Sequence, residues 1–167
     1  MLVGAIALVV ISLYTYHRCF EKKIAYIDIP KVFNGFEMKK EMQEKYKKTE
    51  VTRQRVLDSL SLELQMLSRK LQSDKNNREL MFEFDSKREI YFKKQRQNEE
   101  DNLALSTQYD KQILGQMSQY MLDYGKANGY DVILGADGQG GLMYADEMLN
   151  ISDEITEYIN DKYKGVE

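Results

Sequence analysis

The feature that most constrains this chain is a run of 92 residues, 37–128, that lacks proline and holds only two glycines, Gly115 and Gly125. Proline interrupts a helix because it has no amide hydrogen and its ring clashes with the preceding turn. The chain has one proline, Pro30, no tryptophan and 31% charged residues. This composition favours long helices or a coiled coil over a compact globule.

The run divides into two helices that fold back on each other. Leucines recur at alternating spacings of three and four residues, typical of a coiled-coil seam, at Leu57, Leu60, Leu64, Leu67 and Leu71. A polar cluster at 73–77 predicts a turn. A second seam follows at Leu80, Phe84 and Tyr91, with Lys87 between. We therefore predict an antiparallel helical hairpin over 37–128 with its tip near 73–78.

The register of this hairpin follows from its turn. Folding the chain about residues 75 and 76 makes the numbers of facing residues add to about 151. Leu71 then faces Leu80, and Leu60 faces Tyr91. The segment 93–102 has no apolar residue, so we expect the hairpin to be weak and to bend at this belt, where little is buried.

Short strands flank the hairpin. Residues 23–29 predict a strand, followed by a short helix that Pro30 begins and Gly35 ends. Gly129 ends the hairpin, and strands are predicted at 130–134 and 142–145 around a glycine-rich loop. A closing amphipathic helix has Asn150 as its cap and an apolar face at Ile151, Ile155, Ile159 and Tyr163. The fold class is mostly α, with a small β body of three strands from 21–36 and 129–167.

The N-terminal residues 1–20 form a separate apolar segment. Residues 1–16 carry no charge, and their apolar core has the length of a signal peptide rather than a full membrane span. We expect an uncleaved signal anchor; a cleaved signal peptide and a buried helix are the alternatives. Arg18, Lys22 and Lys23 follow the apolar run and argue against export. A start upstream of Met1 would resolve this conflict.

Both ends of the chain resemble the Skp/OmpH family of periplasmic chaperones. The matching residues are KIAYIDIPKVFNGF at 23–36, YGKANGYDVILGADGQGGLMYAD at 124–146 and LNISDEITEYIN at 149–160. The resemblance implies a homotrimer whose short strands form an intersubunit barrel, with three arms around a cavity. It also implies a periplasmic, ATP-independent holdase for unfolded outer-membrane proteins. We expect the trimer core to comprise Ile24, Tyr26, Ile29, Val132, Leu134, Leu142 and Tyr144.

Apolar side chains off the seam are the candidate client contacts, with basic residues near the tip that could steer acidic clients or meet lipid headgroups. They are Leu62, Met66, Met81, Phe82, Phe92, Lys75, Arg78 and Arg88. Packing within or between arms is the alternative role of the apolar members. The net charge is +2 over 37–128 and −7 over 129–167.

Few residues of the chain are candidates for catalysis. His17 is the single histidine and Cys19 the single cysteine, and the glycine run at 135–141 lacks the Lys-Ser/Thr ending of a phosphate loop. We predict that the protein is not an enzyme and that it has no cofactor, metal site or nucleic-acid partner. The main alternative function is a membrane-anchored coiled-coil stalk, as in subunit b of the rotary ATP synthase, or a tether between partners.

Overall fold

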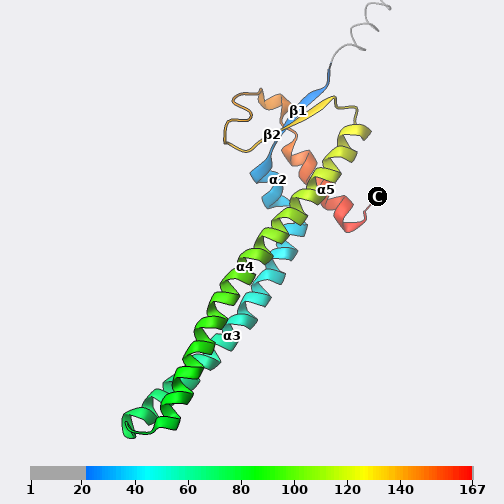
Figure 1. The fold of residues 1–167 in the computed structure, drawn as a ribbon. Coiled ribbons are helices and arrows are strands. Elements are labelled where there is room, and N and C mark those ends of the chain that lie inside the picture. The colour runs from blue at the N-terminus through cyan, green and yellow to red at the C-terminus, as the bar shows by residue number, and fades with distance from the viewer. Residues whose placement is uncertain (1–21, 167) are drawn as a thin grey trace, which may run out of the picture. The chain divides into compact units, whose positions relative to one another are not determined.

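The computed structural model describes residues 22–166, so the predicted N-terminal segment lies outside the described residues. The chain divides into two compact units, which Figure 1 shows as ribbons. We call residues 37–115 the arm, and residues 22–36 with 116–166 the body.

The arm is an antiparallel pair of helices, as predicted. Helix α3 spans Glu37–Ser73 and helix α4 spans Arg78–Ala127, with α4 belonging to the arm as far as Gly115. At the tip, the side-chain oxygen of Asn77 accepts the amide hydrogen of Leu80 at 3.1 Å, and the Asn77 amide group donates to Asp74 at 3.1 Å. Asn77 thus caps α4, which explains why the chain turns at the predicted place.

The contact seam of the arm repeats every 11 residues. Positions with buried or half-buried side chains follow spacings of three and four that sum to 11, at 38, 42, 46, 49, 53, 57, 60, 64, 67 and 71 on α3. On α4 they lie at 80, 84, 87, 91, 95, 98, 102, 106, 109 and 113. Eleven residues make three turns of about 3.67 residues, close to a straight helix. The spacing of three and four among the leucines is therefore one part of a longer repeat.

Contacts across the seam confirm the predicted register. Lys87 forms an ion pair with Glu63, and Asn98 Nδ2 donates to the backbone oxygen of Arg53 at 3.4 Å. The residue numbers of these two pairs add to 150 and 151. The position of the turn thus determines which side chains meet along the arm.

Polar groups occupy the seam at the belt that lacks apolar residues. Asn98 is only 5% exposed, and Arg53 reaches across to the side chain of Asn102 and to Asp101, with 3.6 Å to the latter carboxylate. Helix α4 continues through residues 93–102. Hydrogen bonds and an ion pair therefore replace apolar packing here, and the low stability of this belt stays a prediction.

The body contains a two-stranded parallel sheet. Strands β1 (Ile24–Asp28) and β2 (Val132–Ala136) pair from Ile24 with Val132 to Asp28 with Ala136. The other edge of β1 accepts the amide hydrogen of Ile151, at 3.0 Å from the oxygen of Tyr26.

The structure differs from the prediction at 142–145. This segment forms no strand within the described chain, and β2 pairs with β1 instead of entering a hairpin. Met143 is 87% exposed and Tyr144 84% exposed, so a strand here would bury almost no apolar surface in a single chain. Gly138 and Gly140 adopt positive φ angles in the preceding loop, which leads the chain away from β2.

Three helices complete the body. Helix α2 (Ile29–Gly35) begins with Pro30 in its first turn, and Asp28 accepts the amide hydrogen of Lys31 at 2.9 Å. A 3₁₀ turn, η1 (Glu147–Leu149), precedes helix α5 (Ser152–Lys164). The N-cap of α5 is Ile151 and not the predicted Asn150, because the helix begins at Ser152. Asn150 lies one residue earlier, and its side-chain oxygen accepts hydrogen bonds from the amide and hydroxyl groups of Ser152.

The predicted apolar face of α5 packs into the body core. Ile155 and Ile159 are fully buried, together with Val32 and Phe36. The Phe36 ring meets the rings of Tyr120 and Tyr163 edge to face, with centroids 6.2 and 5.5 Å apart. These contacts fix α5 against β1 and α2.

Replacing Ile155 with Ala should lower the free energy of unfolding by about 2–5 kcal/mol, because it leaves a cavity in the body core. Chemical denaturation at fixed protein concentration measures this loss. The exposed Glu157→Ala change on the same helix is the control and should stay within about 0.5 kcal/mol. Equal effects of the two changes would contradict the packing described for α5.

Replacing Asn98 with Leu should raise the free energy of unfolding by about 1 kcal/mol, because an apolar side chain is better accommodated in a seam than an amide. In the unchanged protein, amide hydrogens at 93–102 should exchange faster than those at 60–71, and Asn98→Leu should slow them. Hydrogen exchange checks both statements, with the exposed Gln97→Leu as control. Equal exchange of the two segments in the unchanged protein would refute the weak belt.

Candidate functional site

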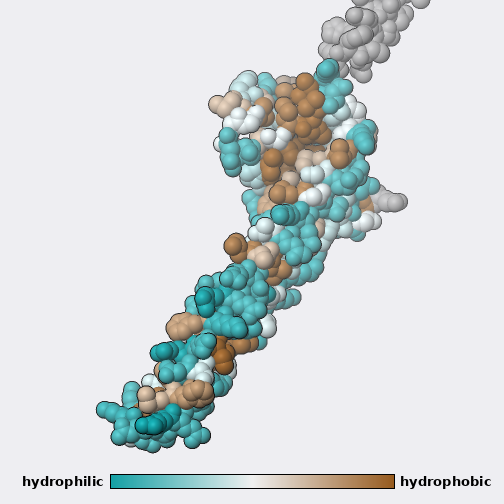
Figure 2. Space-filling view, viewed as in Figure 1, coloured by the Kyte–Doolittle hydropathy of each residue, from teal (hydrophilic) through white to brown (hydrophobic). Residues whose placement is uncertain are grey.

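The apolar side chains predicted to contact a partner are exposed on the arm. Phe82 is 76% exposed, and the other four, Leu62, Met66, Met81 and Phe92, are each about half exposed. Figure 2 shows such apolar residues as separate brown areas on a mostly hydrophilic arm. They lie outside the seam, so the helix pair does not need them for its own packing.

The predicted basic residues are also exposed, but their surroundings differ. Lys75 lies in the turn at the tip and Arg78 at the start of α4. Arg88 forms an ion pair with Asp85 at 3.3 Å and lies over the Phe84 ring at 6.0 Å. Part of its charge is thereby balanced within α4.

Lys87, in contrast, points into the seam. Its hydrogen bond to Glu63 raises the pKa of the Lys87 ammonium group above its ordinary value. The raised pKa keeps the charged form of Lys87 in place, and this residue acts within the arm rather than on its surface.

A stripe of four exposed apolar residues runs along one flank of α4, and sequence reasoning found only half of it. Met81, Phe92, Leu103 and Leu114 are spaced by 11 residues each, and Leu103 is 71% exposed. We call these four residues the flank stripe. The predicted apolar contacts all lie between residues 62 and 92, so they do not include Leu103 and Leu114. The 11-residue spacing was the signal that could have found them.

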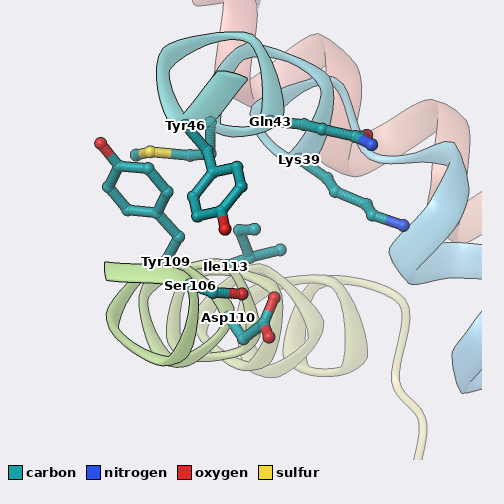
Figure 3. A pocket seen from close by; sticks show the side chains of 8 residues that line it. Lys39, Gln43, Tyr46, Ser106, Tyr109, Asp110 and Ile113 are labelled. Atoms are coloured by element: carbon teal, nitrogen blue, oxygen red, sulfur yellow. The ribbon is translucent and has the colours of Figure 1, made fainter. Parts of the chain in front are cut away.

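A cleft opens between α3 and α4 near the base of the arm, with a volume of about 240 Å³. Figure 3 shows Tyr46 extending from α3 toward α4 and Tyr109 extending from α4 toward α3, with Ile113 between the helices. The full lining is Lys39, Met42, Gln43, Tyr46, Ser106, Tyr109, Asp110 and Ile113. An apolar interior thus lies beneath an edge that carries an ammonium group, a hydroxyl group and a carboxylate.

The body presents an apolar sheet face. Ile24, Val132 and Leu134 are each about 40% exposed, whereas Ala25 and Ile27 on the opposite face of β1 are buried. The other members of the predicted trimer core are half-buried Tyr26, Ile29 and Leu142 and exposed Tyr144. Figure 2 shows apolar side chains gathered on this part of the body.

One polar contact borders this face. The Tyr26 hydroxyl group donates to Glu147 at 3.2 Å. Burial, and then the negative charge of Glu147, raise the pKa of the Tyr26 phenol, so it stays a neutral donor. The face therefore has one fixed polar group at its edge and apolar side chains across its centre.

Two other kinds of feature, a metal site and a membrane span, are absent from residues 22–166. Within 22–166, no three His, Cys, Asp or Glu side chains come close enough together to hold a metal ion. No helix in this part of the chain has the length and apolar character needed to cross a membrane.

The sequence and the fold both match known proteins. The family described as Outer membrane protein (OmpH-like) matches residues 23–159. The fold is similar to the crystal structure of a protein from Caulobacter crescentus CB15 solved as a proposed outer membrane chaperone (OmpH-like), with a TM-score of 0.74. That alignment covers 85% of this chain and 86% of the other, at 11% sequence identity. No functionally curated protein matches the sequence.

Proposed function

Because the chain belongs to the OmpH-like outer membrane protein family, we propose that it is a periplasmic chaperone that holds unfolded outer-membrane proteins without ATP. The observation that carries this proposal is the set of large apolar side chains exposed on the arm, which the arm's own packing leaves unused. Unfolded outer-membrane strands expose apolar side chains in alternation, and water drives such surfaces together.

Holding requires no chemical step, and the chaperone is not an enzyme. Each arm residue offers a small apolar contact, and several contacts to one client act together through a high effective concentration. Methionine side chains such as Met66 and Met81 adapt to varied partners because they are unbranched and polarisable. The client leaves when it folds into the membrane and buries its own apolar surface.

We propose a homotrimer assembled through the sheet face of the body. One face of the sheet packs within the body, where Ala25 and Ile27 are buried, and the other face leaves Ile24, Val132 and Leu134 about 40% exposed. Residues 142–145 would form the third strand only when a neighbouring copy offers an edge. Three copies would then place three arms around one client.

Charge and membrane attachment are further parts of the proposal. Lys75, Arg78 and Arg88 would steer acidic client segments or meet lipid headgroups near the tip. Residues 1–16 would anchor the chaperone to the inner membrane. A membrane-anchored stalk or tether remains the second candidate, because it shares the apolar segment and the long helices.

The full chain should keep a urea-diluted outer-membrane β-barrel protein soluble without ATP, and the triple change Met81→Ser, Phe82→Ser, Phe92→Ser should weaken this holding about tenfold or more. The reason is the loss of three apolar contacts, each worth about 1 kcal/mol or more. Light scattering and the retained client fraction measure the effect.

The matched control replaces three exposed polar residues of α4, Gln97, Gln108 and Gln112, with Ser. It should hold the client as well as the unchanged chain does. Aggregation of the client in the presence of the unchanged chain would favour the stalk or tether.

Replacing Leu134 with Asp should reduce the solution mass from three chains to one, because a carboxylate cannot be buried in an apolar interface without a partner. Analytical ultracentrifugation measures the mass, and Ala127→Asp, also exposed on the body, is the control. A Leu134→Asp protein that keeps the mass of three chains would place the interface elsewhere.

A further inference from the structure

We propose that the cleft between α3 and α4 receives an aromatic side chain from the end of a client's membrane strand, and that the flank stripe guides the rest of that strand along α4. This inference rests on the proposed chaperone function and names the part of the client that the arm recognises. The cleft and the stripe both lie within the arm.

The flank stripe and the cleft belong to the same side of α4. From Leu103, steps of three, four and four residues lead to Ser106, Asp110 and Leu114. Such steps keep side chains on one side of a helix. The seam residue Ser106 and the exposed residue Asp110 both line the cleft, so the edge of the cleft at Asp110 lies on the line that joins Leu103 and Leu114.

The dimensions of the cleft suit one aromatic ring. A cavity of about 150 Å³ can hold benzene, and this cleft has a volume of about 240 Å³. Ile113 is 2% exposed and provides an apolar floor, and Met42 adds an adaptable thioether. The rings of Tyr46 and Tyr109, which come from opposite helices, can meet an inserted ring edge to face.

The edge of the cleft favours a ring with a polar end. Ser106 and Asp110 bring a hydroxyl group and a carboxylate to the α4 side of the cleft, and Lys39 lines the cleft from α3. A tyrosine hydroxyl or a tryptophan N–H could find a partner here while its ring is buried. A purely aliphatic side chain would leave these groups without a new partner.

The spacing of the stripe suits an extended strand. With a helical rise of 1.5 Å per residue, neighbouring members are about 16.5 Å apart. A membrane-spanning β-strand has about 9–11 residues, which at about 3.3 Å each cover roughly 30–36 Å. A strand whose end lies in the cleft near Asp110 therefore passes Leu103 and reaches Phe92, which lies 18 residues, or about 27 Å, along α4.

Clients of the proposed class carry aromatic residues where this geometry needs them. The strands of outer-membrane barrels alternate apolar and polar side chains, and aromatic girdles mark both ends of the apolar band. A strand with a terminal aromatic residue and alternating apolar residues thus presents a ring to the cleft and apolar side chains to the stripe.

The test uses the full chain and two labelled 11-residue peptides with alternating apolar and polar residues. One peptide ends in Tyr and the other in Leu. The full chain should bind the Tyr peptide about three- to tenfold more tightly, which is the scale of an aromatic pair. Fluorescence anisotropy gives the two affinities.

Ser106→Phe should fill the cleft and bring the affinity ratio of the two peptides to about one. Gln108→Phe adds the same ring to an exposed position of α4 and should keep the preference for Tyr. Tyr46→Leu removes a ring partner without filling the cleft and should reduce the preference. Circular dichroism verifies that each variant keeps its helices.

Equal binding of both peptides by the unchanged chain would overturn this inference and leave the holding activity standing. A preference that survives both Ser106→Phe and Tyr46→Leu would place aromatic recognition elsewhere and overturn it as well. A change of solution mass in the Ser106→Phe protein would indicate that the cleft contacts a neighbouring copy, and this result would also overturn the inference. If the unchanged chain failed to hold the barrel protein, this result would refute the proposed function instead.

Discussion

The arm depends on the seam between α3 and α4, whose inward positions repeat every 11 residues on both helices. Since 11 residues make three nearly regular turns, the seam stays on one side of each helix over its whole length. The outward positions then keep fixed sides too, which is why Met81, Phe92, Leu103 and Leu114 form a straight stripe. The period that packs the arm therefore also arranges its exposed surface.

The seam contains both apolar and polar side chains. Near the tip it contains leucines, and at the belt it contains Asn98, Asn102 and Arg53, which are paired by hydrogen bonds. A buried amide in a helical seam lowers stability but penalises other registers, because a shifted pairing would leave it without a partner. The Lys87–Glu63 ion pair adds the same kind of constraint. These polar pairs thus favour one register of the arm, in which Arg53 meets Asn98 and Lys87 meets Glu63.

Much of the fold could be predicted from the sequence because it follows from local signals. Pro30, Asn77 and Gly129 mark helix ends through backbone chemistry that acts over a few residues. The strand at 142–145 could not be judged in this way, since its pairing depends on which edges other segments, or other copies, leave open. For the site, their apolar character and their positions off the predicted seam identified Phe82 and Phe92. Leu103 could have been found from the 11-residue spacing, whereas the cleft emerges only when both helices are placed together.

The distribution of apolar residues on the arm also bears on solubility. A chain that binds unfolded proteins must expose apolar surface, yet large continuous patches lead to self-association. Here the stripe members are separated by three helical turns that carry charged residues such as Arg88, Arg96 and Glu99. Under the proposed function, an extended client would touch several members at once, and these contacts would act together through a high effective concentration.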